Sequence, residues 1–278
     1  MPWVPTRRSV DADAAPGPWP ASWLRPTWAQ AGVSAVMTTR EGGRSLPPFD
    51  GFNLRSALGD DDRAVAEHHA LLRTWTGATP VWLRQVHGAR VVRLHPSDAA
   101  PGAPVHEADA SVSTEPGLAC AVQVADCLPV LMAARGRAVA AAHAGWRGLA
   151  LGVVEATLAA LCEAADCGPS EVEAWLGPCI GPARFEVGPD VLDAYGAGPA
   201  SPGDRFVPRG AEHPGKWLAD LPGLAADRLR AAGVRRVTGA ARCTVEERSS
   251  FFSFRRDGLT GRMAALVWLD AGAAFRGA

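Results

Sequence analysis

One stretch, residues 117–161, constrains the fold most, because short apolar runs within it end at chemically reactive side chains. Runs of this length that are bounded by Gly, Pro or Arg are typical of buried strands rather than helices. Three such runs are present, at residues 117–125, 129–134 and 138–142. The first leads into Asp126 and Cys127, and the last leads into His143. This pattern predicts a thiol and an imidazole just beyond the ends of two neighbouring strands.

The segment after His143 reads Ala-Gly-Trp-Arg-Gly and predicts a sharp turn at Gly145 and Gly148. Residues 149–161 are apolar or small and contain no helix breaker after Gly152, which favours a helix. A strand, a glycine turn and a helix in succession are a common place for ligand-binding backbone.

Strand and helix patterns mix along the whole chain, without internal repeats or a low-complexity linker. We therefore expect an α+β or α/β fold in one domain. Further strands are expected at residues 33–38, 81–86, 91–94, 110–113, 172–176, 234–239 and 262–269. Helices are expected at residues 64–75, 149–161, 189–195 and 218–232. Residues 1–30 are rich in Pro and Trp and are expected to be irregular, with some tryptophans packing onto a domain formed by residues 31–278.

The composition excludes several classes of protein. The 278 residues carry a formal net charge of −1 with a pI of about 6.7, which argues against a nucleic-acid partner. No uncharged run approaches the roughly 20 apolar residues of a membrane span, and no apolar segment follows Arg7 and Arg8 as in a signal peptide. The six cysteines form no Cys-x-x-Cys pair, which argues against a zinc ribbon. We expect a cytoplasmic protein without a membrane partner; the sequence predicts no oligomeric state.

Two of the seven histidines stand out. His87 and His143 each follow an apolar strand and precede a glycine, and Cys127 has the same placement. Three soft ligands at three strand ends, with no obvious fourth, fit a catalytic zinc with an open coordination position. The same residues also fit a Cys127 nucleophile with a histidine base. The remaining histidines are expected to be ordinary surface residues: His68, His69, His95, His106 and His213.

Arginines next to predicted turns suggest a site for a small anionic group such as phosphate. Arg40 follows a predicted strand, Arg147 begins the predicted helix, and Arg255 ends the run Phe-Phe-Ser-Phe-Arg. Strand-like alternation in that run would place Phe252 and Phe254 on one face. That face would serve either as part of the core or as a surface on which a base stacks.

Taken in order, the motifs resemble those of the YfiH-type family, also called the laccase-domain or polyphenol oxidase family. They include Gln-Val-His-Gly, Ala-Asp-Cys, His-Ala-Gly-Trp-Arg-Gly, Gly-Pro-Cys-Ile-Gly-Pro and Thr-Gly-Arg-Met-Ala, and they run from about Val33 to Leu269. Members of the family are described as purine nucleoside phosphorylases. The resemblance implies a single-domain α/β fold, a layered sandwich of mixed β-sheets flanked by helices, with residues 31–278 as the catalytic domain.

The resemblance also implies one zinc ion held by His87, Cys127 and His143, which would then be catalytic as well as ligating. It implies phosphorolysis of adenosine, inosine and methylthioadenosine, with some adenosine deamination. The substrates would be a nucleoside and phosphate. In that setting Asp126 would orient a histidine or act as an acid or base, and the phosphate-binding candidates are Arg40, Arg147 and Arg255.

The sequence departs from the family pattern where tyrosine is usual or common. Phe185 and Phe254 stand at two such positions, and Val245 stands after Cys-Thr at a third. These departures bear on substrate specificity and leave the zinc ligands untouched.

Two alternatives remain at this point. A multicopper mechanism is not expected, because seven histidines include no His-x-His pair, although the sequence leaves zinc versus copper open. A different enzyme activity would be an amidase that edits a peptidoglycan precursor, with attack on a carbonyl by Cys127 or by a zinc-activated water. A metal-dependent binding protein without catalytic activity is the non-enzymatic alternative.

Overall fold

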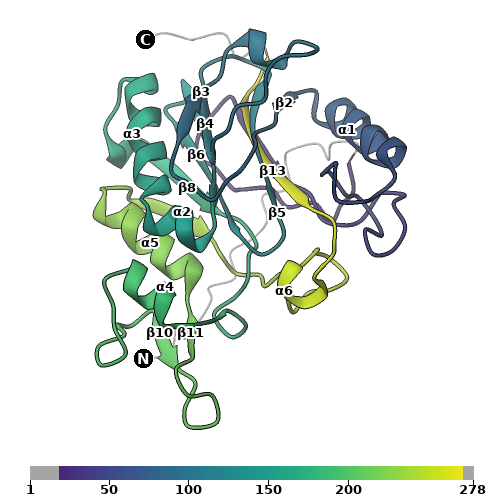
Figure 1. Ribbon diagram of the computed structural model, residues 1–278. Coiled ribbons are helices and arrows are strands. Elements are labelled where there is room, and N and C mark those ends of the chain that lie inside the picture. The colour runs from purple at the N-terminus through teal and green to yellow at the C-terminus, as the bar shows by residue number, and fades with distance from the viewer. Residues whose placement is uncertain (1–18, 272–278) are drawn as a thin grey trace.

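Two β-sheets packed face to face form the centre of the structure, a computed structural model that describes residues 19–271 (Figure 1). The larger sheet has the order β12-β8-β6-β7-β4-β3, and the smaller has the order β1-β13-β5-β2. The larger contains β3 (Val91–Arg93), β4 (Ala110–Ser113), β6 (Leu128–Ala134), β7 (Ala138–Ala144), β8 (Val172–Leu176) and β12 (Arg236–Gly239). The smaller contains β1 (Val33–Met37), β2 (Thr79–Val81), β5 (Leu118–Val124) and β13 (Met263–Leu269). Both sheets mix parallel and antiparallel pairs.

The apolar runs of the sequence form the buried strands between the helical layers. Every residue of β5, β6, β7 and β13 is buried. On β6, Leu131 and Ala133 face the smaller sheet, whereas Val130 and Met132 face the helices on the opposite side. Strands buried on both faces need apolar side chains at every position, which explains runs without polar alternation.

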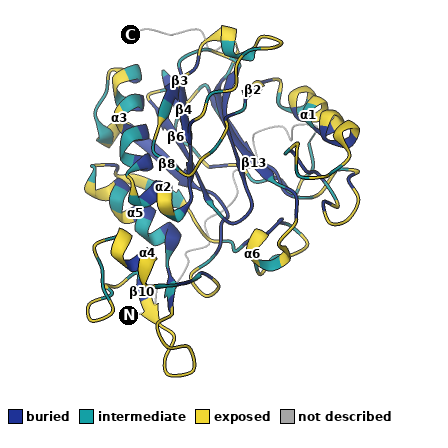
Figure 2. Cartoon of the chain, in the orientation of Figure 1, coloured by how far each residue is buried: buried dark blue, intermediate teal, exposed yellow. Residues whose placement is uncertain are grey.

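Helices cover the outer face of each sheet, as Figures 1 and 2 show. α3 (Val153–Ala165) and α5 (Leu221–Ala231) pack on the larger sheet. α1 (Asp62–Thr76) lies on the other side, where Leu72 and an aromatic group pack against the smaller sheet. The predicted layered α/β sandwich of mixed sheets is confirmed.

Short elements complete the chain. They are α2 (Trp146–Ala150), α4 (Pro189–Ala194), α6 (Phe254–Asp257), 3-10 turns at Pro96–Ala99 and Pro169–Glu171, and a three-stranded sheet of β10 (Phe206–Pro208), β11 (Trp217–Ala219) and β9 (Glu186–Val187). None of the helices in residues 19–271 has the length and apolar character needed to cross a membrane.

Tryptophans within residues 19–30 pack on the body of the fold. Residues 19–30 form turns and one β-bridge, from Leu24 to Met37. Trp19 stacks on Trp23, which in turn contacts Phe52 with ring centroids 5.2 Å apart. The expectations for the earlier residues, including the arginine pair at 7 and 8, lie outside the described residues.

Three local predictions were wrong. The strand expected at 81–86 ends at Val81, and the residues after it form a loop. The helix expected from 218 begins at Leu221, because Trp217–Ala219 is β11 and Asp220 caps the helix by accepting a hydrogen bond from the amide of Gly223. His68 is buried rather than exposed, with its Nε2 accepting from the Arg44 amide and its Nδ1 donating to the Asn53 carbonyl.

The phenylalanine run is also not a strand. Phe251 and Phe252 are fully buried in coil, and Ser253 then caps α6 by accepting a hydrogen bond from the Arg256 amide. Phe254 is therefore the first residue of a helix and is 59% exposed. A serine that can cap a helix outweighed the alternating pattern, so Phe252 and Phe254 do not share a face.

Candidate metal centre

Cys127 lies in a turn that crosses from one sheet to the other. β5 ends at Val124 in the smaller sheet, and β6 begins at Leu128 in the larger one. Asp126 in this turn has a φ of 98°, a conformation that residues other than glycine rarely adopt. A strained backbone held at such a turn is typical of a functional site.

His143 reaches the same place through the pairing of β6 with β7. Leu128 pairs with Ala144, and Pro129 pairs with His143. Cys127 and His143 therefore lie at one end of the same hairpin. The sequence predicted both side chains just past strand ends, but His143 lies within β7, and Cys127 precedes β6.

His87 comes from the loop after β2 and is held there by Asp109, a residue that the sequence analysis missed. The carboxylate of Asp109 accepts hydrogen bonds from the amides of Val86, His87 and Gly88 at 3.1, 2.9 and 2.7 Å. It also accepts one from His143 Nδ1 at 2.8 Å. One fully buried carboxylate thus fixes the backbone of one histidine and the ring of the other.

The three side chains form a compact donor set. One ligand atom each from His87, Cys127 and His143 lies within 4.8 Å of the others, and this is the one such group of three or more His, Cys, Asp or Glu residues within residues 19–271. Cys127 Sγ and His87 Nε2 are 3.8 Å apart, close to the roughly 3.6 Å expected for S and N ligands of one tetrahedral zinc. His143 Nδ1 is engaged by Asp109, which leaves Nε2 for a metal. The residues therefore fit a metal ion with an open position.

Glycines next to this set are required by close packing rather than by an unusual turn. A Cβ at Gly145 would lie 2.9 Å from His87 Cδ2 and 3.1 Å from Cys127 Sγ. A Cβ at Gly148 would lie 2.7 Å from the Gly88 carbonyl oxygen. Neither glycine has a positive φ. The glycine pattern of His-Ala-Gly-Trp-Arg-Gly thus brings α2 against the His87 loop.

The charges at the centre favour a thiolate. Burial would raise the pKa of Cys127, but the neighbouring imidazoles of His143 and His87 outweigh it and lower the pKa to about 6. Burial would likewise lower the pKa of His143, but Cys127 and Asp109 raise it to about 9. For comparison, burial without a cationic neighbour raises the pKa of Cys120 to about 12. A thiolate is the form of cysteine that binds metals and acts as a nucleophile.

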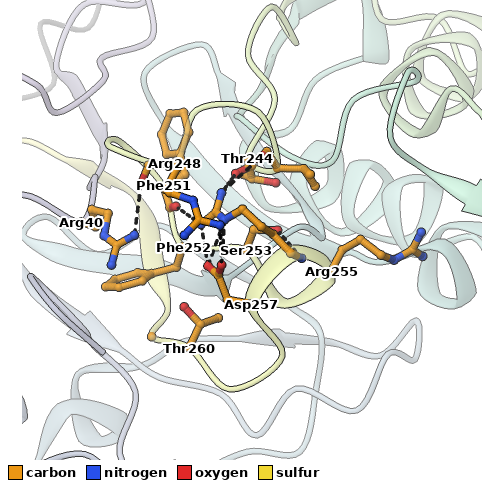
Figure 3. A network of polar contacts seen from close by, with 12 residues as sticks. Arg40, Thr244, Arg248, Phe251, Phe252, Ser253, Arg255, Asp257 and Thr260 are labelled. Carbon is orange, nitrogen blue, oxygen red and sulfur yellow. Dashed lines mark hydrogen bonds and ion pairs between the residues drawn. The ribbon is translucent and has the colours of Figure 1, made fainter. Parts of the chain in front are cut away.

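Asp126 holds the crossing turn to two other segments. Its Oδ1 accepts a hydrogen bond from Thr244 Oγ1 and its Oδ2 accepts one from the Arg255 amide, both at 2.6 Å. Thr244 and Arg255 are drawn with their neighbours in Figure 3. Asp126 therefore links the Cys127 turn to the start of α6. Its carboxylate contacts these two groups, and it is Asp109 that contacts the histidine.

The three arginines predicted to bind phosphate have other contacts. Arg40 donates to the Asp50 and Arg248 carbonyls and lies over the Phe252 ring (Figure 3), beside a separate cavity of about 500 Å³. Arg147 is exposed, with its guanidinium 4.2 Å from the centre of the Trp146 ring. Arg255 donates from its side chain to the Glu186 carbonyl.

A cavity of about 320 Å³ opens onto the donor set. Drug-sized ligands bind in pockets of roughly 300–1,000 Å³. The lining of this cavity includes His87, Cys127 and His143. The other polar or aromatic side chains that line it are Arg55, Gln85, Gln123, Phe254 and Arg262. Arg40, Arg147 and Arg255 are not among its lining residues.

Known proteins are similar to this chain over most of its length. A family model described as multi-copper polyphenol oxidoreductase laccase matches residues 34–270. A purine nucleoside phosphorylase from Pseudomonas aeruginosa is 48% identical over 251 residues, which cover 90% of this chain and 99% of that protein. The purine nucleoside phosphorylase YfiH from Escherichia coli is 46% identical over 248 residues, which cover 88% of this chain and 97% of that protein.

Two solved structures have a similar fold and a related sequence. A Neisseria meningitidis protein superposes with a TM-score of 0.81 at 44% identity, covering 90% of this chain and all (100%) of that one. YlmD from Geobacillus stearothermophilus superposes with a TM-score of 0.82 at 32% identity, covering 93% of this chain and 98% of that one.

Proposed function

This chain belongs to the multi-copper polyphenol oxidoreductase laccase family, the YfiH-type family, and we propose that it is a zinc-dependent purine nucleoside phosphorylase. Its substrates would be adenosine, inosine or methylthioadenosine together with phosphate, with adenosine deamination as a further activity. The names of the relatives support phosphorolysis. The observation that carries the proposal is the His87, Cys127 and His143 donor set facing a cavity of ligand size.

The donor set supports one bound metal ion rather than a multicopper centre. A laccase-type oxidase would need several copper sites, whereas residues 19–271, which contain all seven histidines, hold one group of three such donors. Two imidazoles and a thiolate suit zinc as a four-coordinate ion with one open position. They would also accept copper, so metal analysis of the purified protein is part of the test below.

The chain's own residues position the reactants. In phosphorolysis the bond from the ribose C1′ to the base breaks and a bond from C1′ to a phosphate oxygen forms. The base nitrogen gains the proton that hydrogen phosphate gives up, so the products are free base and the sugar 1-phosphate. The exposed ring of Phe254 at the cavity offers a face for the purine. Asp109 keeps the ring of His143 oriented. When bound, zinc supplies Lewis acidity and, for deamination, an activated water.

Asp126 is proposed as a positioning residue. Both of its carboxylate oxygens accept hydrogen bonds, one from the Thr244 hydroxyl and one from the Arg255 amide. Because it ties the Cys127 turn to α6, it places the ligand and the ring of Phe254 on the same cavity. The acid or base role expected for Asp126 from the sequence stays a prediction.

A second candidate is the peptidoglycan-precursor amidase, and one observation favours it. Asp109, His143 and Cys127 form a chain of carboxylate, imidazole and thiol that resembles a cysteine nucleophile with its base. The position of His87 argues for the metal, because a nucleophile needs one imidazole and this thiol has two.

Product analysis separates the two candidates. Purified zinc-loaded protein is incubated with adenosine, inosine or methylthioadenosine, with and without phosphate, and in parallel with a muramyl-amino-acid substrate. The phosphorylase proposal predicts free base and the sugar 1-phosphate, which is ribose 1-phosphate from adenosine or inosine and methylthioribose 1-phosphate from methylthioadenosine, only when phosphate is present. Release of the amino acid, together with a trapped acyl-enzyme on Cys127, would instead establish the amidase. A cytoplasmic location is proposed with this activity, and fractionation of cells tests it.

A further inference from the structure

Two arginines that share the cavity with the metal centre have no acidic partner. Arg55 and Arg262 both line the cavity of about 320 Å³ that contains His87 and Cys127. Neither forms an ion pair with a carboxylate anywhere in the described part of the chain. The cavity lining itself contains no aspartate or glutamate. Most other arginines at comparable depth have such a partner, as Arg205 has in Asp220 and Asp227.

The two arginines are held side by side by one buried amide. The side-chain oxygen of Asn53, a residue with no exposed surface, accepts hydrogen bonds from the backbone amides of Arg55 at 3.1 Å and Arg262 at 2.9 Å. The amide of Leu54 adds a further link to the Arg262 carbonyl at 3.1 Å. The backbone positions of both arginines are therefore fixed by a buried residue of the fold.

The side chains are oriented and keep donors free. One guanidinium nitrogen of Arg55 donates to Gln123 Oε1 at 3.3 Å, and one of Arg262 donates to the Thr260 and Gly261 carbonyls. Each guanidinium has five N–H donors, so most of them have no partner among the described residues. Burial lowers the pKa of Arg262 and the nearby positive charge of Arg55 lowers it further, and together they outweigh the opposing negative charges of Cys127 and Asp126. An anion bound by both guanidinium groups would offset the repulsion between them.

We propose that Arg55 and Arg262 form the anion subsite of the cavity and bind the attacking phosphate, in place of Arg40, Arg147 and Arg255. This assignment rests on the proposed phosphorolysis. The chemistry selected is a small tetrahedral oxyanion, because two planar forks can each bind two of its oxygens. Phe254 supports the placement, since its ring lies 5.8 Å from the Arg262 guanidinium on the same cavity, so that a purine on that ring would lie next to the anion.

The test measures phosphate in two ways. The zinc-loaded Arg55→Gln and Arg262→Gln variants are compared with wild type for the KM of phosphate in inosine cleavage and for the Kd of inorganic phosphate by calorimetry. Loss of a charge-assisted pair of hydrogen bonds predicts a rise of about 10- to 100-fold in both constants. Arg55→Lys and Arg262→Lys keep the charge but not the fork, and an intermediate rise is expected.

Two other substitutions are the comparisons. Arg230→Gln removes an exposed arginine on α5 and should leave both constants unchanged. Arg147→Gln tests the position predicted from the sequence and should also leave them unchanged. Thermal unfolding of each variant identifies any that fails to fold, in which case the lysine variants supply the answer.

The outcomes separate this inference from the proposed function. If the wild type cleaves inosine with phosphate and neither Arg55 nor Arg262 affects the phosphate KM or Kd, the anion subsite is wrong and the phosphorylase stands. If the wild type binds phosphate through these arginines but cleaves no nucleoside, the subsite stands and the phosphorylase is wrong. A rise in phosphate KM confined to Arg147→Gln would return the role to the sequence-predicted arginine.

Discussion

Replacing Asp109 by asparagine should disconnect both histidines of the metal centre at once. Each carboxylate oxygen accepts two hydrogen bonds: Oδ1 from the amide of His87 and from His143 Nδ1, and Oδ2 from the amides of Val86 and Gly88. An asparagine amide keeps one acceptor oxygen and turns the other position into a donor. Whichever way the amide is oriented, two N–H groups lose their acceptor and face another N–H.

The expected loss of stability follows from those two lost hydrogen bonds. Hydrogen bonds to a charged group are worth roughly 1.5–3 kcal/mol each, and Asp109 has no exposed surface to soften the loss. We expect the free energy of unfolding of the metal-free protein to fall by about 3 kcal/mol. Because residues behind the ligands typically contribute 10- to 100-fold to metal affinity, zinc binding should weaken by at least about tenfold.

Urea unfolding of the metal-free protein and a zinc titration against a competing chelator measure the two effects. Asp98→Asn is the matched control, because Asp98 also accepts from a backbone amide, that of His95, and from a histidine ring, that of His106, and neither it nor His106 belongs to the donor set. The Asp98→Asn substitution should lower the free energy of unfolding by about 1 kcal/mol or less and leave the zinc affinity unchanged. If Asp109→Asn binds zinc and unfolds like the wild type, the proposed support of both histidines by Asp109 is wrong.

Three further predictions concern the surroundings of the site. Gly145→Ala places a methyl group 2.9 Å from His87 and 3.1 Å from Cys127, so elemental analysis should find well below one zinc ion per chain. Gly168→Ala has open space around the new methyl group and should keep its zinc. Full zinc content in Gly145→Ala would contradict the packing argument. Asp126→Asn weakens the hydrogen bonds to Thr244 and Arg255, which should lower the free energy of unfolding by roughly 1–3 kcal/mol and raise the nucleoside KM. An unchanged stability together with an unchanged KM would show that Asp126 is not a positioning residue. Burial lowers the pKa of His69 to about 4, so between pH 6.5 and 4 the unfolded state binds a proton that the folded state does not. As the pH falls through that range, the free energy of unfolding of the wild type should decrease by up to roughly 3 kcal/mol relative to His69→Gln. Parallel curves of stability against pH for the two proteins would refute this prediction.

The central part of the fold and the ligand set could be predicted from the sequence because local pattern determines them. The strands leading to Cys127 and His143 are uninterrupted apolar runs, and such runs are buried whichever elements surround them. The reactive side chains at their ends then lie at one edge of the sandwich. What local pattern could not supply was the pairing, which places β5 and β7 in different sheets and makes β6 and β7 the hairpin.

The residues that the sequence analysis missed act through contacts between distant segments. In the sequence, nothing distinguishes Asp109 from an ordinary polar residue before a short strand. Its role depends on the loop from Val86 to Gly88, whose amides donate hydrogen bonds to it only in the folded chain. Arg55 and Arg262 meet through Asn53, which lies 209 positions before Arg262 in the sequence. The arginines chosen from the sequence were those next to motifs, and adjacency along the chain did not predict which guanidinium groups line the cavity.

The most direct test of a zinc-dependent phosphorylase is to titrate metal-free protein with zinc and follow phosphate-dependent release of hypoxanthine from inosine. A zinc-dependent phosphorylase should show no phosphate-dependent release without metal, a linear increase with added zinc, and a plateau at one zinc ion per chain. The same titration of Cys127→Ser should stay near zero until zinc is in large excess, because a hydroxyl is a poor zinc ligand. Full activity in the metal-free wild type, or no phosphate-dependent release at one zinc per chain, would contradict the account.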